Sequence, residues 1–89
     1  ITDAENLSVG IPYPIPAYEQ ITCDIYTKIP TDLDISIFSI FGKLVKHETI
    51  SQHKGYMKYV VNVTDLSGGM YFIRVNSKDE SITHKFEIR

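Results

Sequence analysis

The chain is poor in cysteine, in tryptophan and in long apolar runs, and it has little net charge. A single cysteine among 89 residues excludes an internal disulfide. No apolar run approaches the roughly 20 residues that a membrane-spanning helix needs. The net charge of −2 is too small to indicate a nucleic-acid-binding surface. These shortages exclude a disulfide-stapled scaffold, a membrane-spanning helix and a nucleic-acid partner.

The remaining composition is that of one small globular domain. Hydrophobic residues make up 43% of the chain and charged residues 22%, which excludes gross disorder. The given sequence does not begin with methionine, and its residues 1–10 lack the basic start and apolar centre of a signal peptide. We interpret the chain as a C-terminal fragment of a longer protein, with residues 1–10 as a linker.

The charges are unevenly distributed along the sequence. Residues 1–42 hold six acidic residues and one lysine, whereas residues 43–89 hold eight basic and five acidic residues. This polarity indicates either an ordinary solvated surface or a docking face that is guided by charge.

Apolar residues recur with a period of two, which is typical of half-buried β-strands. Clear alternation runs through residues 20–26, 59–63, 70–75 and 82–88. In the first of these, Cys23 shares its face with isoleucines, so we predict a buried, apolar thiol. Residues 34–41 are apolar on both faces, which predicts a strand that is central in its sheet or covered on its second face.

Turns and loops are predicted where proline, glycine and short polar residues gather. Residues 11–17 contain three prolines and cannot form a central strand. Residues 28–33, 51–58 and 76–81 are predicted as turns or loops, and Gly42 and Gly69 as turn glycines. The resulting six or seven short strands predict an all-β fold, a small Ig-like antiparallel β-sandwich.

Groups that carry chemistry are few and scattered. None of the three histidines, His47, His53 and His84, has a second ligand at the spacing that zinc sites use. The sequence also lacks a nucleophile elbow and a phosphate-cradling glycine loop. We therefore predict no catalytic residue, no metal or other cofactor and no small-molecule substrate. His84 is predicted to be a neutral, hydrogen-bonded side chain at the edge of the core.

Four motifs, in one order, resemble a known family. They are YPIPA (13–17), IFSIFGKLVK (37–46), DLSGGMYFIRV (65–75) and THKFEIR (83–89). Together they are similar to the type A C-terminal sorting domain of cargo proteins of the bacterial type IX secretion system. The resemblance covers residues 11–89, which we take as the sorting domain. Ile15 departs from the pattern, because the family usually has asparagine there.

The resemblance implies a secretion signal and not an enzyme. Such domains fold in the periplasm as an Ig-like sandwich and direct their cargo through an outer-membrane translocon, with a shuttle protein, to the cell surface or the exterior. The family motifs imply that recognition involves Tyr13, Pro14, Pro16, Gly42, Lys43, Gly69, Tyr71, Lys85, Phe86, Ile88 and Arg89.

The resemblance also implies that a sortase-like peptidase usually removes the domain. The cut would fall in the segment before the sandwich, a processing region made of Ile1, Thr2, Asp3, Ala4, Glu5, Asn6, Leu7 and Ser8. The YPIPA motif then has two interpretations, a recognition feature or a stiff entrance to the sheet.

The terminal strand, residues 82–88, likewise has two interpretations. As an edge strand it would display Lys85 and Arg89 and dock a partner by strand addition. Alternatively, it closes the sheet and its charges are incidental. A free terminal strand also allows a homodimer by strand exchange.

One alternative function comes from a different class, an Ig-like or fibronectin-like module for adhesion or carbohydrate binding. Exposed aromatic side chains are typical of sugar-binding faces, and the chain has six tyrosines. However, Tyr59 and Tyr71 fall on apolar faces and tryptophan is absent, so we interpret most tyrosines as core or edge residues.

Overall fold

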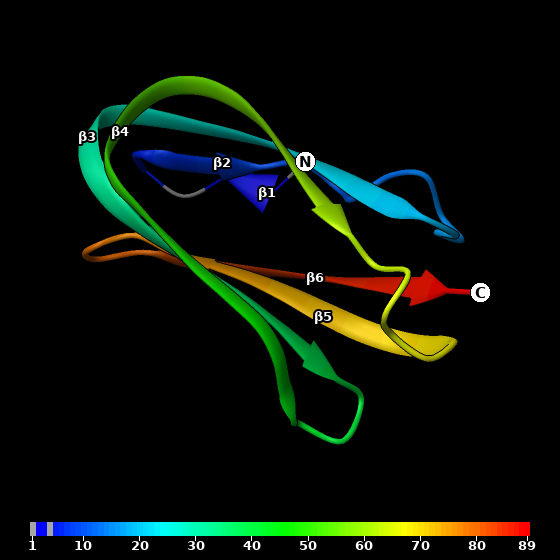
Figure 1. Cartoon of the computed structure of the whole chain (residues 1–89). Coiled ribbons are helices and arrows are strands. Elements are labelled where there is room, and N and C mark those ends of the chain that lie inside the picture. The colour runs from blue at the N-terminus through cyan, green and yellow to red at the C-terminus, as the bar shows by residue number, and fades with distance from the viewer. Residues whose placement is uncertain (1, 4) are drawn as a thin grey trace.

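Strands and their connections make up the whole of the computed structural model, which describes residues 2–3 and 5–89. In chain order the strands are β1 (Thr2–Asp3), β2 (Leu7–Val9), β3 (Gln20–Ser39), β4 (Leu44–Asn62), β5 (Gly69–Asn76) and β6 (Ser81–Ile88) (Figure 1). All strand pairs are antiparallel, which confirms the predicted all-β fold. Within the described residues there is no helix long and apolar enough to cross a membrane.

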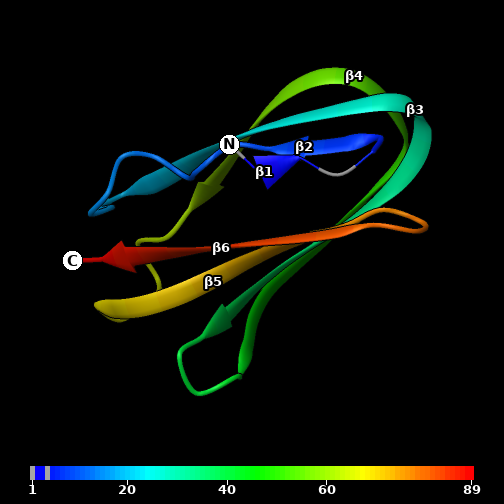
Figure 2. The same ribbon diagram turned by 180° about the vertical axis from the view of Figure 1, so that it is seen from behind.

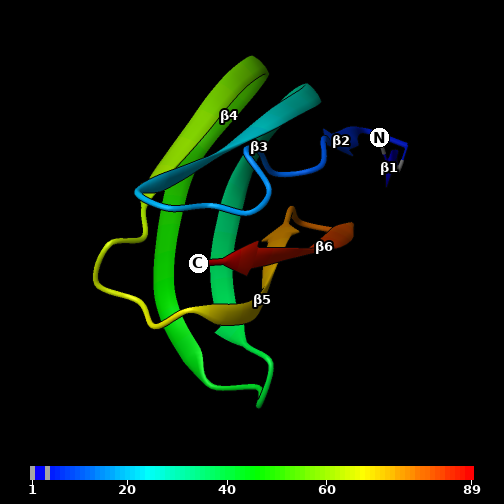
Figure 3. The same cartoon turned by 90° about the vertical axis from the view of Figure 1, so that its right-hand side faces the viewer.

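The long strands β3 and β4 form a bent ribbon that contributes to both layers of the sandwich. In the first layer, the beginning of β3 pairs with β2 and with the end of β4. In the second layer, the end of β3 lies between the beginning of β4 and β5, and β5 pairs with β6. Figures 1 and 2 show the ribbon arching from one layer to the other, and Figure 3 shows β3 and β4 running side by side along one side of the molecule.

The ribbon bends where its register shifts. Thr31 pairs with His53 and Leu33 with Ile50. Between these two pairs β3 has one residue, Asp32, whereas β4 has two. Such a bulge bends a strand and increases its twist. The Asp32 carboxylate accepts hydrogen bonds from the backbone and side-chain nitrogens of Gln52, at 2.9 and 3.2 Å, and holds the bulge.

The structure therefore corrects two sequence predictions. Residues 28–33 and 51–58, which we expected to be a turn and a loop, lie within the continuous strands β3 and β4. Proline, aspartate and glycine weaken a flat strand, but the same residues suit a bend: Pro30 lies where the ladder is interrupted, and Gly55 has φ +91°. Local composition does not distinguish a bend of this kind from a loop.

The core lies between the two layers. It contains the predicted inward faces of β3, β5 and β6, including Cys23, Ile73 and Phe86, each 1% exposed or less. Thr27 and Ser36 are buried polar residues, and the Thr27 hydroxyl donates to the carbonyl oxygen of His53 at 3.1 Å. Among the described residues, every buried side-chain nitrogen and oxygen has a hydrogen-bond partner.

Part of the predicted linker belongs to the sandwich. Leu7 and Val9 are each 1% exposed, and β2 pairs with β3 from Leu7 opposite Thr27 to Val9 opposite Ile25. Thr2–Asp3 pair in turn with β2. The expectation of a linker through residue 10 is therefore wrong for residues 2–3 and 7–9, because strands of two or three residues are too short for their alternation to be recognised. Ile1 and Ala4 lie outside the described residues.

The second face of the central strand is only partly covered. As predicted, residues 34–39 are central, between β4 and β5. The apolar residues that follow were expected to continue this buried pattern, but Ile40 is 54% and Phe41 94% exposed. They lie in the turn between β3 and β4, beyond the reach of the opposite layer.

We predict that Gly42→Ala lowers the free energy of unfolding by about 1 kcal/mol. Gly42 has φ +84°, and a Cβ atom there would meet no other atom within 4 Å, so the loss is one of backbone conformation alone. For a domain of this size the melting temperature should fall by roughly 4–8 °C. Gly10→Ala is the matched control, because Gly10 lacks the left-handed conformation. An unchanged melting temperature for Gly42→Ala would contradict the assignment.

We also predict that the Cys23 thiol does not react in the native protein. Burial raises the pKa of Cys23 to about 12, and the neighbouring Asp24 carboxylate adds to the shift, so the reactive thiolate is disfavoured. At about pH 8 the native chain should resist iodoacetamide, while the denaturant-unfolded chain is alkylated. Mass spectrometry measures the adduct, and equal rates in both states would sink the prediction.

Candidate recognition surface at the terminal strand

The terminal strand β6 lies at the edge of the second layer. Within the described part of the chain its one strand partner is β5, from Gly69 opposite Ile88 to Asn76 opposite Ser81. Alternate side chains of β6 point into the core, and Ile82, Phe86 and Ile88 are buried as predicted. Thr83, Lys85 and Arg89 are exposed. The strand thus has an apolar face that holds it and a polar face toward solvent.

Three of the predicted recognition residues are buried and hold the strand in place. The rings of Tyr71 and Phe86 stack with centroids 5.9 Å apart. The Tyr71 hydroxyl donates to the carbonyl oxygen of Ser67 at 2.6 Å, which ties β5 to the turn before it. A receptor therefore does not contact Tyr71, Phe86 and Ile88 directly. These side chains affect recognition only through the conformation that they give to β6.

The glycine pair before β5 accommodates the end of β6. Gly69 has φ +150° and confirms the predicted turn glycine. At Gly68, a Cβ atom would lie 3.3 Å from the carbonyl oxygen of Ile88, which is a tight contact with backbone. Sequence reasoning singled out Gly69 for the site, but Gly68 is the position where the end of β6 passes closest.

The YPIPA motif contacts the end of β6. Ala17 is fully buried, its N–H donates to the carbonyl oxygen of Glu87 at 2.8 Å, and its carbonyl oxygen accepts the N–H of Arg89 at 2.9 Å. The motif therefore lies in the connection between two strands of the sandwich, β2 and β3. This corrects the interpretation that it precedes the sandwich as a stiff entrance. Sequence reasoning missed Ala17. The only sign of its role in the sequence was a small apolar residue in a polar, proline-rich segment.

The first half of the motif lies elsewhere, on the outer face of the first layer. The Tyr13 hydroxyl donates to the Asp24 carboxylate at 3.3 Å and accepts from the Lys58 ammonium at 3.0 Å. Burial alone would raise the pKa of Asp24, but hydrogen bonds from Tyr56, Lys58 and Tyr13 lower it below its ordinary value. Pro14 and Pro16, which follow Tyr13, are exposed and half-buried.

Two of the six tyrosines pack in or against the core, and the other four lie on the surface. Tyr59 is half-buried and Tyr71 buried, whereas the exposed ones are Tyr13, Tyr18, Tyr26 and Tyr56.

The middle of the β6 edge has free backbone groups. Glu87 and Arg89 use their backbone groups on the side away from β5, and backbone groups alternate along a strand. The N–H and C=O groups of Thr83 and Lys85 therefore face the same way. Within residues 2–3 and 5–89 they have no backbone partner.

Both ends of this edge are tethered to the N-terminal part of the chain. Near its start, the backbone N–H of Asn6 donates to both carboxylate oxygens of Glu80 at 3.1 Å. On the inner face, the His84 ring hydrogen-bonds to the carbonyl oxygen of Val9 at 2.8 Å, which confirms that His84 is hydrogen-bonded at the core edge. At the far end Ala17 bridges to β6. The open stretch is therefore short and rigidly presented.

Gly42 and Lys43 lie away from this edge, in the turn between β3 and β4. The carbonyl oxygen of Lys43 accepts the N–H of Ser39 at 2.8 Å, and the N–H of Ile40 donates to the carbonyl oxygen of Met70 at 3.1 Å. The turn is thus joined to the beginning of β5. The recognition residues predicted from the sequence do not form one cluster, but lie at the β6 edge, at this turn and at Tyr13.

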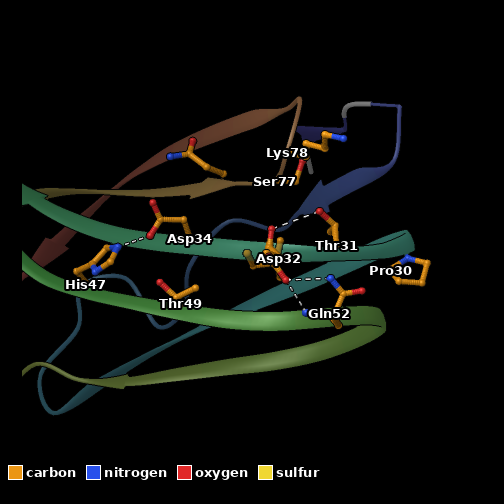
Figure 4. Close-up of a pocket in the computed structure, with 11 residues that line it drawn as sticks. Pro30, Thr31, Asp32, Asp34, His47, Thr49, Gln52, Ser77 and Lys78 are labelled. Carbon is orange, nitrogen blue, oxygen red and sulfur yellow. Dashed lines mark hydrogen bonds and ion pairs between the residues drawn. The ribbon is translucent and has the colours of Figure 1, made fainter.

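A polar cavity of about 600 Å³ lies at the bend of the ribbon and contains none of the predicted recognition residues (Figure 4). Asp34 contacts His47, and Asp32 binds Gln52, across β3 and β4. Among the described residues no group of three metal-ligating side chains comes together. The cavity is explained by the bulge that opens the ribbon there.

Comparison with known proteins identifies the family. Residues 12–89 match the family described as secretion system C-terminal sorting domain, and no curated protein matches the chain. The matched region runs from just before the YPIPA motif through β6, so it includes both partners of the contact at Ala17. Because the match spans most of the chain, the protein belongs to this non-catalytic family and is a type IX secretion sorting signal, which interacts with the secretion machinery to bring its cargo to the cell surface or the exterior.

Proposed function

We propose that a shuttle protein of the outer-membrane translocon reads the free edge of β6 in the periplasm. The observation that carries the proposal is the set of unpaired backbone groups at Thr83 and Lys85, fixed between two tethered ends. A partner strand that pairs with this edge gains main-chain hydrogen bonds, and its alternate side chains supply specificity.

The surrounding side chains support this role for β6. Phe86 and Ile88 are buried and prevent the strand from moving, so little order is lost when a partner binds. Lys85 and Arg89 are exposed on the polar face and attract acidic groups. The same strand thus combines a rigid backbone with a basic surface.

We further propose that the sortase cuts before residue 7. A peptidase needs an accessible, extended segment, and the burial of Leu7 removes β2 from consideration. Within the processing region, residues 1–6 are thereby favoured over Leu7 and Ser8. Cleavage there would remove at most the two-residue strand β1 and would leave β2 to β6 in place.

A homodimer by strand exchange would use the same edge. Such a dimer is also part of the proposal, as a competitor of the shuttle protein for β6. Light scattering on the purified chain would give twice the monomer mass if exchange takes place.

We predict that Thr83→Pro abolishes export of a reporter fused in front of residues 1–89. Proline removes the N–H that points away from β5, and the ladder to β5 does not use that N–H. The domain should therefore fold but present a blocked edge. Export is measured as reporter released by cells that have a type IX system.

Thr83→Val is the matched control, because it keeps the N–H and the branched shape of the side chain. Circular dichroism must show that the proline variant still melts cooperatively. Wild-type export of a folded Thr83→Pro fusion would refute docking at this edge.

A second prediction concerns processing. N-terminal sequencing of the released domain should begin at or before Leu7, since β2 is buried in the core. A new terminus after Val9 would contradict the proposal, because it would require removal of β2 from the sandwich.

A further inference from the structure

A groove of about 340 Å³ lies on the outer face of the second layer, and the residues that line it come from three of the four family motifs. Phe38 lines it from the end of β3, Ile40 and Gly42 from the turn that follows, Phe72 and Arg74 from β5, and Thr83 from β6. The groove thus extends from the turn after β3, across β5, to β6, the strand that forms the terminal edge. The groove is therefore part of the surface that a partner bound to β6 would meet.

The apolar character of the groove follows from the register of the sheet. Phe38 lies opposite Leu44 on β4 and opposite Phe72 on β5, and Phe72 lies opposite Lys85. One row of side chains thus crosses four strands on the face that points away from the core. Leu44 is 50% and Ile40 54% exposed.

This exposure does not stabilise the isolated domain. Large apolar side chains on a central strand are usually covered, and apolar patches with a polar rim are typical of sites where another protein binds. The core between the layers is already filled by the opposite faces of the same strands. The row is thus available to a partner.

The charges around the groove define the partner's chemistry. The Arg74 guanidinium lies 4.7 Å from the centroid of the Phe38 ring. Lys85 flanks Phe72, and no carboxylate among the described residues lines the groove. Glu87, further along β6, is engaged by the Nε of Arg89 at 3.4 Å. The groove is locally basic although the whole chain carries a charge of −2.

We infer that this groove binds a large apolar side chain flanked by carboxylates on a protein of the secretion machinery. The inference rests on the proposed function and adds a second contact beside the β6 edge. Thr83 belongs to both, since its backbone faces the edge and its side chain lines the groove. A strand paired with β6 would place alternate side chains on the outer face of the sheet beside Thr83 and Lys85, with Arg74 and Phe72 one strand further on.

The test uses the same reporter fusion with two variants of the groove. Ile40→Ser removes an exposed apolar wall, and Arg74→Glu reverses the charge. Each should lower export by about tenfold or more, the scale expected when one anchor of an interface is lost. Both side chains are exposed, so the melting temperature should fall by a few degrees at most, mainly through loss of the contact between Arg74 and Phe38.

Two matched controls separate the groove from general surface effects. Val60→Ser replaces an apolar residue that is 51% exposed, against 54% for Ile40, and Lys54→Glu makes the same charge reversal as Arg74→Glu. Both should be exported normally. A photo-crosslinking residue at position 40 should form an adduct with a component of the type IX machinery, and one at position 60 should not.

The outcomes distinguish the inference from the proposed function. If the unaltered fusion is exported and the Thr83→Pro fusion is not, normal export of both groove variants overturns the groove alone. Failure of the unaltered fusion to be exported overturns both. An adduct at position 40 with the mass of two fusion chains would show that a second copy occupies the groove, and would also overturn the inference.

Discussion

The bend in the ribbon of β3 and β4 is the constraint on which the rest of the structure depends. Because one pair of strands crosses between the layers, each layer needs only one or two further strands to enclose a core. Asp32 and Gln52 hold the bulge at which this crossing takes place. Thus 89 residues suffice for a sandwich that would otherwise need a separate connection for each strand.

The bend also decides which strand remains at the edge. The second half of β3 pairs with β4 on one side and with β5 on the other. Among the described strands, β6 can therefore pair only with β5, at the edge of the layer. Natural proteins usually protect such edges with short strands, charges or covering loops. Here Ala17 covers one end and lysine and arginine lie along the strand, but the backbone at Thr83 stays accessible. An edge that is only partly protected suits a domain whose role is to be bound.

The sequence predicted the fold class and the inward faces of the strands because burial in a sheet repeats every second residue. It failed at the bend, where Pro30, Asp32 and Gly55 have the composition of loops, and at β2, which is too short to show a period. It identified Gly42 and Gly69 because a positive φ favours glycine strongly. It did not identify Ala17 or the groove at Phe38, since both depend on segments that are distant in the sequence and adjacent only after folding.

The contacts that tether β6 have a consequence for how the signal is read. Asn6 and Glu80 are separated by 74 residues, and Val9 and His84 by 75, so almost the whole chain must be in place before they form. Contacts of this range make folding slow compared with that of helical domains. A disordered chain contains the same amino acids but has no fixed row of amide and carbonyl groups at Thr83 and Lys85. Binding to this row therefore depends on conformation as well as on sequence, and a receptor of this kind selects chains in which the sorting domain has finished folding.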